Sequence, residues 1–143
     1  LVLEGWRAAS AQDFAGALGL TAPLASGDPV LRLADPFARA ALYLGRARWL
    51  DRLDRLEAAA RSLLWHENSD FDGWGIGEAQ AADVDGALGG VARLHRARLF
   101  RTLGRTEESC SLARRLSELW RQAEPAYAGL RQEVAQLLAE CGR

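Results

Sequence analysis

Lysine and methionine are both absent from this 143-residue chain, and all eighteen of its basic residues are arginine. Together with the abundance of alanine, leucine and glycine, this bias is typical of GC-rich bacterial genomes, so we expect a bacterial source. The sequence begins with Leu1 rather than an initiator methionine. We therefore expect a fragment of a longer chain, in which a targeting signal upstream of Leu1 remains compatible with the sequence.

Long apolar runs are also missing. No run approaches the roughly eighteen residues that a membrane span needs, and the opening "LVLEGWRAAS" lacks the basic start and apolar middle of a signal peptide. A composition of 49% hydrophobic and 26% charged residues is that of a soluble globular protein. Because the net charge is −1, neither nucleic acid nor a membrane is the expected partner, and we expect a cytoplasmic protein.

Cysteine and histidine are too scarce for most catalytic or metal chemistry. Cys110 and Cys141 are too few for a disulfide scaffold, and each falls in a helical apolar pattern, so we expect small buried thiols. The two histidines, His66 and His95, show no zinc-ligand spacing. Cys110 and His95 could form a nucleophile–base pair across packed helices, but no third orienting residue is evident. We expect no catalytic residue, no metal site and no cofactor.

Helical periodicity dominates what is present. From Tyr127 to Cys141 the apolar residues fall on one helical face. Asp35 followed by Pro36 predicts a helix start, because aspartate caps free N–H groups and proline suits the first helical position. Strand patterns are almost absent, so the predicted fold class is all-α. The expected helices cover residues 2–18, 36–51, 54–66, 86–102, 106–121 and 125–141.

Two predicted helical hairpins correspond when the chain is shifted by fifty residues. Short links join helix 36–51 to helix 54–66 and helix 86–102 to helix 106–121, and such links force antiparallel neighbours. The shift aligns Arg46-Ala47-Arg48 with Arg96-Ala97-Arg98, and it also aligns Leu53 with Leu103, Arg55 with Arg105 and Glu57 with Glu107.

The second hairpin resembles a tetratricopeptide repeat, a helix pair of 34 residues that stacks into a solenoid. In "RLHRARLFRTLGRTEESCSLARRLSELW" the resemblance rests on Ala97, Phe100, the turn glycine Gly104 and the packing residue Ser109. "LYLGRARWLDRLDRLEAAARSLL" fits more loosely, through Ala47, Leu50 and Ala59, with Asp54 in place of the glycine. Other helical-hairpin repeats leave a similar trace.

This resemblance, which covers roughly residues 37–141, implies one short solenoid domain spanning 1–143. The predicted parts are an N-terminal helix and loop (1–35), a first hairpin (36–66), an acidic glycine-rich connector (67–85), a second hairpin (86–121) and a solvating end helix (125–141).

The acidic connector raises the alternative of a calcium-responsive module. Asn68, Asp70 and Asp72 begin a calcium loop, but its final acid, Glu78, falls one position early and Ala79 stands in its place. Asparagine, aspartate, serine and glycine are also the usual residues of turns. We interpret the segment as mainly a connector, and the loop at 68–78 remains an alternative ligand site.

The expected function is a non-catalytic scaffold that binds another protein or another region of its parent chain. Recognition would use the exposed faces of the first helices, with Arg48 and Arg98 as equivalent contacts and Trp74 in the connector as a further anchor. A second alternative is that the chain is the non-catalytic portion of a larger enzyme.

Overall fold

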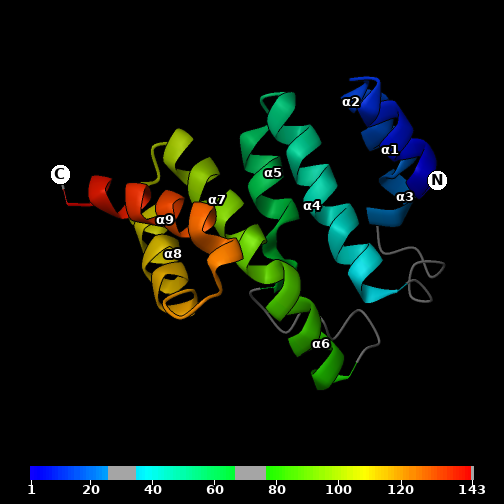
Figure 1. The fold of residues 1–143 in the computed structure, drawn as a ribbon. Coiled ribbons are helices and arrows are strands. Elements are labelled where there is room, and N and C mark those ends of the chain that lie inside the picture. The colour runs from blue at the N-terminus through cyan, green and yellow to red at the C-terminus, as the bar shows by residue number, and fades with distance from the viewer. Residues whose placement is uncertain (26–34, 67–76, 143) are drawn as a thin grey trace. The chain divides into compact units, whose positions relative to one another are not determined.

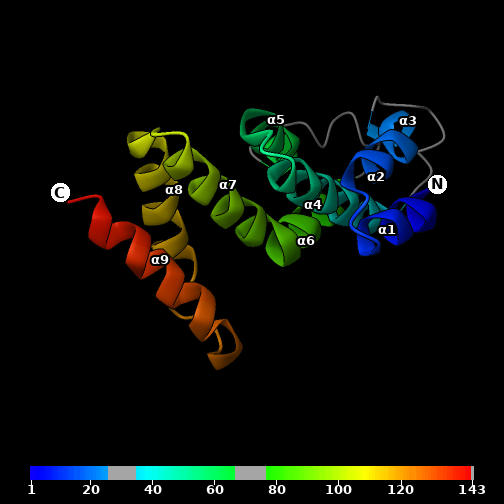
Figure 2. The same cartoon turned by 90° about the horizontal axis from the view of Figure 1, so that it is seen from above.

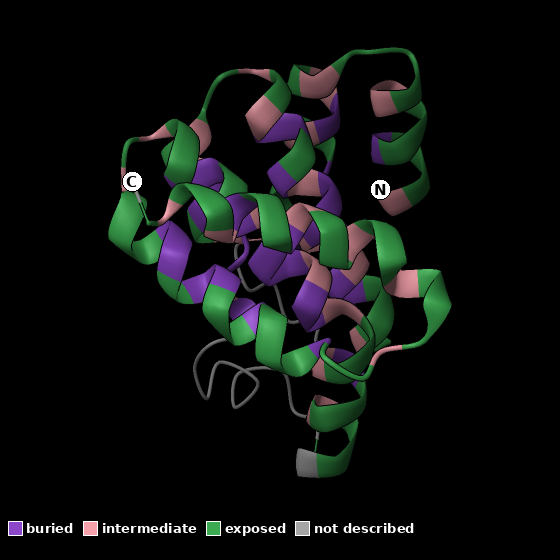
Figure 3. Ribbon diagram, turned by 60° about the vertical axis from the view of Figure 1, so that its left-hand side comes forward, coloured by how far each residue is buried: buried purple, intermediate pink, exposed green. Residues whose placement is uncertain are grey.

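The structure is a computed structural model and describes residues 1–25, 35–66 and 77–142. Helices make up the regular structure, and no strand occurs within these ranges (Figure 1), as the sequence predicts. The chain divides into two compact units, Leu1–Leu88 and Gly89–Arg143. Figure 3 shows that buried positions follow one side of the longer helices, which is the pattern of amphipathic helices.

Unit 1 begins with a helical hairpin that the sequence did not predict. A single helix over 2–18 was expected, but α1 (Val2–Ser10) ends in a tight turn and α2 (Phe14–Leu20) follows and packs against it. The Asp13 carboxylate accepts a 2.8 Å hydrogen bond from the Gly16 N–H and so caps the start of α2. The expected loop after it contains the short helix α3 (Ala22–Ala25).

The second hairpin of unit 1 follows the prediction closely. It pairs α4 (Pro36–Arg52) with α5 (Leu56–Ser62), and a 3-10 turn extends it to His66. Asp35 caps α4 by accepting a 3.0 Å hydrogen bond from the Ala38 N–H, which confirms the predicted helix start. Helix α2 packs against α4, and the core there contains Ala17, Leu24, Leu42 and Trp49.

The predicted connector contains a helix. Instead of beginning at residue 86, the helical backbone begins at α6 (Glu78–Val84), continues through a π-helical segment (Asp85–Gly89) and becomes α7 (Gly90–Thr102). Helix α6 contacts α4 within unit 1, and Val84 is fully buried. Tertiary packing therefore outweighs the helix-weakening glycines of this stretch.

The described residues of unit 2 form three α-helices and a 3-10 turn. Helix α7 pairs with α8 (Thr106–Leu119), and α9 (Ala128–Glu140) follows a 3-10 turn at Pro125–Tyr127 and packs against α8 (Figure 2). The structure therefore contains more helices than the six expected from the sequence.

The three hairpins end their first helices in the same way. The turn residue in the left-handed region is Gln12 (φ 63°), Asp54 (φ 57°) or Gly104 (φ 75°). The next residue donates its N–H to the carbonyl five positions back, from Asp13 to Ala8 (2.9 Å), Arg55 to Leu50 (2.9 Å) and Arg105 to Phe100 (2.8 Å). This combination is the Schellman motif. It occurs in both hairpins that the fifty-residue shift relates, at Asp54 and Gly104. It occurs a third time at Gln12, in the α1–α2 hairpin.

Small residues recur at the helix crossings. Gly5, Ala47 and Ala97 hold the same place relative to the three turn residues, and all are buried. On the second helices the corresponding residues are Ala17, Ala59 and Ser109, also buried. A Cβ atom at Gly5 would lie 2.6 Å from the Thr21 methyl carbon, so this site has no room for a side chain.

Candidate functional site

Helix α9 runs antiparallel to α8 in unit 2, and this arrangement determines the site. The end of α8 meets the start of α9, where the rings of Trp120 and Tyr127 lie 6.0 Å apart. The start of α8 meets the end of α9, where Cys110 and Cys141 are joined. Val134, in the middle of α9, is buried. Both ends of α9 are therefore held against the hairpin.

The disulfide corrects the expectation of two buried thiols. Cys110 and Cys141 form a disulfide with a Cα–Cα distance of 5.8 Å, so neither residue is a thiol and Cys110 is no free nucleophile for His95. The antiparallel packing brings together two residues that are far apart in sequence.

Charged residues join α9 to α7. Arg98 forms an ion pair with Glu133, and Arg101 forms one with Glu140. All four side chains are 40–47% exposed, so each pair contributes about 0–1 kcal/mol. They link α9 to α7 at two points.

These pairs distinguish the two arginines that the sequence predicts as equivalent contacts. Arg98 is exposed but already shares its charge with α9. Arg48 is exposed on α4 in unit 1 and forms no ion pair with any described residue. The same position in the two hairpins therefore has different surroundings.

Several other arginines are structural rather than part of a solvated basic face. Arg39, Arg93 and Arg96 are buried. Arg46 donates a 3.0 Å hydrogen bond to the Leu18 carbonyl and a further one to the Thr21 hydroxyl. These bonds fix α4 to the end of α2, and burial lowers the pKa of Arg46.

A second arginine cluster surrounds Phe100. The guanidinium carbons of Arg96 and Arg105 lie 4.9 Å and 4.2 Å from the centre of the Phe100 ring, within cation–π range. The Arg105 Nε atom also donates a 2.8 Å hydrogen bond to Glu108. That bond lowers the pKa of the Glu108 carboxyl from its ordinary value. The cluster stabilises the turn between α7 and α8.

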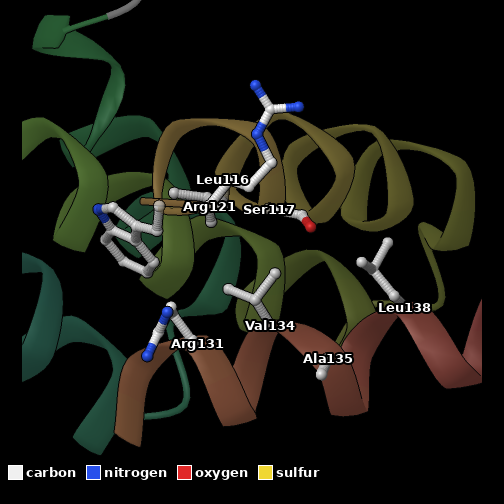
Figure 4. A pocket seen from close by; sticks show the side chains of 8 residues that line it. Leu116, Ser117, Arg121, Arg131, Val134, Ala135 and Leu138 are labelled. Atoms are coloured by element: carbon white, nitrogen blue, oxygen red, sulfur yellow. The ribbon is translucent and has the colours of Figure 1, made fainter. Parts of the chain in front are cut away.

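An apolar pocket of about 180 Å³ opens between α8 and α9 (Figure 4). Its apolar wall comes from both helices, and Arg121 and Arg131 also line it. No single stretch of sequence indicates this pocket, because it exists only where the two helices pack. The lining residues are Leu116, Ser117, Trp120, Arg121, Arg131, Val134, Ala135 and Leu138.

The proposed calcium loop and the connector anchor lie largely outside the described residues. Asn68, Asp70, Asp72 and Trp74 fall in the range 67–76, and of Glu78 only the backbone, which begins α6, is described. Among the described residues, no group of three or more His, Cys, Asp or Glu side chains could hold a metal ion. Within the same ranges no helix has both the length and the apolar character of a membrane span.

In comparisons with known proteins, no protein-family model matches the chain, and neither a curated protein nor a solved structure matches it.

Proposed function

We propose that this chain is a helical-repeat module of the tetratricopeptide type that binds another protein, or another part of its parent chain, without catalysing a reaction. The observation that supports the proposal is the threefold recurrence of one hairpin design. Each hairpin has the same left-handed turn residue position, the same five-back hydrogen bond and a buried small residue at the same place in the crossing.

A repeated hairpin favours binding for a physical reason. In helical-repeat proteins each hairpin buries one side of its helices against its neighbours and leaves the other side to solvent, so repetition produces an extended surface. Partners of such proteins dock as helices or extended segments on that surface. Arg48 is the strongest contact residue, because it is exposed on a first helix and has no described acidic partner.

The disulfide bears on where the module acts. Disulfides persist mainly in oxidising compartments and are rare in the cytoplasm of mesophiles. The Cys110–Cys141 bond therefore weighs against the expected cytoplasmic location, which stays a prediction.

A displayed library of random peptides tests the interaction function. We expect the immobilised protein to enrich peptides that bind the native chain and not the heat-unfolded chain. Arg48→Glu should weaken the binding of most of these peptides. The control Arg61→Glu, on the exposed side of α5, should leave their binding unchanged. Failure to enrich any peptide over the bare matrix would contradict the proposal. Equal binding to the unfolded chain would contradict it as well.

A further inference from the structure

The pocket between α8 and α9 combines an apolar hollow with positive charge that described acids do not fully neutralise. Leu116 and Val134 are buried in its wall, and Leu138 is half-buried. Figure 4 shows these side chains converging from the two helices. Ala135 and Leu138 keep part of the apolar lining accessible, and covering such surface favours the binding of a partner.

The size of the pocket limits what can occupy it. At about 180 Å³ it is smaller than the roughly 300–1,000 Å³ typical of sites for drug-sized ligands and cofactors. A single large aliphatic or aromatic side chain matches it better. Interfaces commonly bind such an anchor side chain in a central apolar pocket and place polar contacts around the rim.

The charge at the rim specifies what surrounds the anchor. Arg131 forms no ion pair with a described residue, and Arg121 has Glu118 at 3.5 Å, with both of those side chains at least 70% exposed. Glu118 is the one acid that faces Arg121 among the described ion pairs, so the rim keeps a net positive charge. The Ser117 hydroxyl adds a hydrogen-bond donor to the same rim.

We propose that this pocket binds an acidic protein segment, seating one large apolar side chain against Ala135 and Leu138 and placing carboxylates against Arg121 and Arg131. This inference rests on the proposed interaction function and adds a second surface with a defined ligand chemistry. The pocket belongs to unit 2, whereas Arg48 belongs to α4 of unit 1. The rim charges contribute specificity and association rate more than affinity.

Three labelled synthetic peptides test the ligand chemistry. The first contains one leucine within a run of glutamates, the second replaces that leucine by serine, and the third replaces the glutamates by lysines. Fluorescence anisotropy with the oxidised full chain should show saturable binding of the first peptide only. Raising the salt concentration should weaken the binding of this peptide, because salt screens exposed charges.

Paired variants test the location. Ala135→Phe fills the pocket and should weaken binding of the first peptide by about tenfold or more, as expected when an interface anchor is lost. Arg131→Glu places a carboxylate against those of the peptide and should also weaken its binding, because like charges at an interface repel. The controls are Ala139→Phe, on the exposed side of α9, and Arg115→Glu, on α8 outside the pocket. Both controls should bind the first peptide with an affinity within about twofold of that of the parent. Circular dichroism confirms that each variant is folded.

Three results would overturn the inference. The first is no saturable binding of the leucine–glutamate peptide. The second is equal weakening by Ala135→Phe and Ala139→Phe. The third is tighter binding of a single-stranded oligonucleotide that displaces the peptide from the same residues, which would assign the rim to nucleic acid. If peptides that depend on Arg48 still bind under any of these results, the pocket inference fails and the interaction function stands.

Discussion

The Ser109 hydroxyl donates a 2.8 Å hydrogen bond to the backbone carbonyl of Ala97 where α7 crosses α8. The bond requires close approach of the two helices, and Ala97 is fully buried at that point. A carbonyl within a helix can accept this second bond because it has two lone pairs. The crossing is therefore fixed by a small side chain on one helix and a short polar one on the other.

Enlarging Ala97 should destabilise the protein. Ala97→Leu adds three carbons to a crossing without free space, and overpacking of this kind costs about 1–3 kcal/mol. Urea unfolding measures the change, with Ala139→Leu on the exposed side of α9 as the control. An Ala97→Leu protein as stable as the control would show that the crossing has more room than the structure indicates.

Replacing Asp54 by glycine and Gly104 by aspartate should have opposite effects on stability. Asp54 holds a φ of 57°, which strains a residue with a Cβ atom, whereas Gly104 holds a φ of 75° without strain. Asp54→Gly should raise the free energy of unfolding by about 0.5–1 kcal/mol, and Gly104→Asp should lower it by about 1 kcal/mol. Asp54→Ala is the control and should be destabilising, since alanine tolerates this region less well than aspartate. A stabilising Gly104→Asp would refute the shared turn geometry.

Reducing the disulfide should lower the stability of unit 2. The bond joins residues separated by 31 positions, and loss of a native disulfide from a small domain costs about 2–5 kcal/mol. Thermal unfolding with and without a phosphine reductant measures this effect. The double variant Cys110→Ser/Cys141→Ser should melt like the reduced parent and should not respond to reductant. A reductant-sensitive double variant would mean that the observed loss has another origin.

Protonation of Glu108 should weaken the α7–α8 turn. The hydrogen bond from Arg105 lowers the pKa of this carboxyl in the folded state below its ordinary value of 4.5. A depressed pKa stabilises the fold at pH values above the unfolded-state pKa, and the contribution disappears as the pH falls through the folded-state pKa. Glu108→Gln should therefore melt lower than the parent at pH 7, and the difference should close at acidic pH.

The matched control is Glu107→Gln, an exposed neighbour on α8. Its melting temperature should follow that of the parent across the same pH range. A difference between Glu108→Gln and the parent that persists at the acid end would assign the effect to packing rather than to charge.

The sequence predicted local structure better than it predicted the site. The helix start at Asp35 and the correspondence of Asp54 with Gly104 depend on residues close together in the chain, so composition and spacing are enough to find them. The missed turn at Gln12 carries a weaker signal, because its main marker is the cap residue Asp13. Glutamine offers no conformational hint comparable to the glycine at position 104.

The pocket and the disulfide depend on long-range packing. Trp120 and Arg131 come from different helices and line one hollow only because α9 turns back along α8. Each residue alone is an ordinary core or surface residue. The same reversal brings Cys110 to Cys141, so a correct expectation of antiparallel packing for α9 would have been needed before either feature could be predicted.

The Cys110–Cys141 bond also changes what a protease can do to this molecule. Because every basic residue in the chain is arginine, trypsin cuts only after arginine, and four exposed arginines lie between the two cysteines: Arg114, Arg115, Arg121 and Arg131. A single cut after any of them leaves both fragments covalently joined. The nicked protein keeps its full mass on a non-reducing gel and separates into two bands only after reduction.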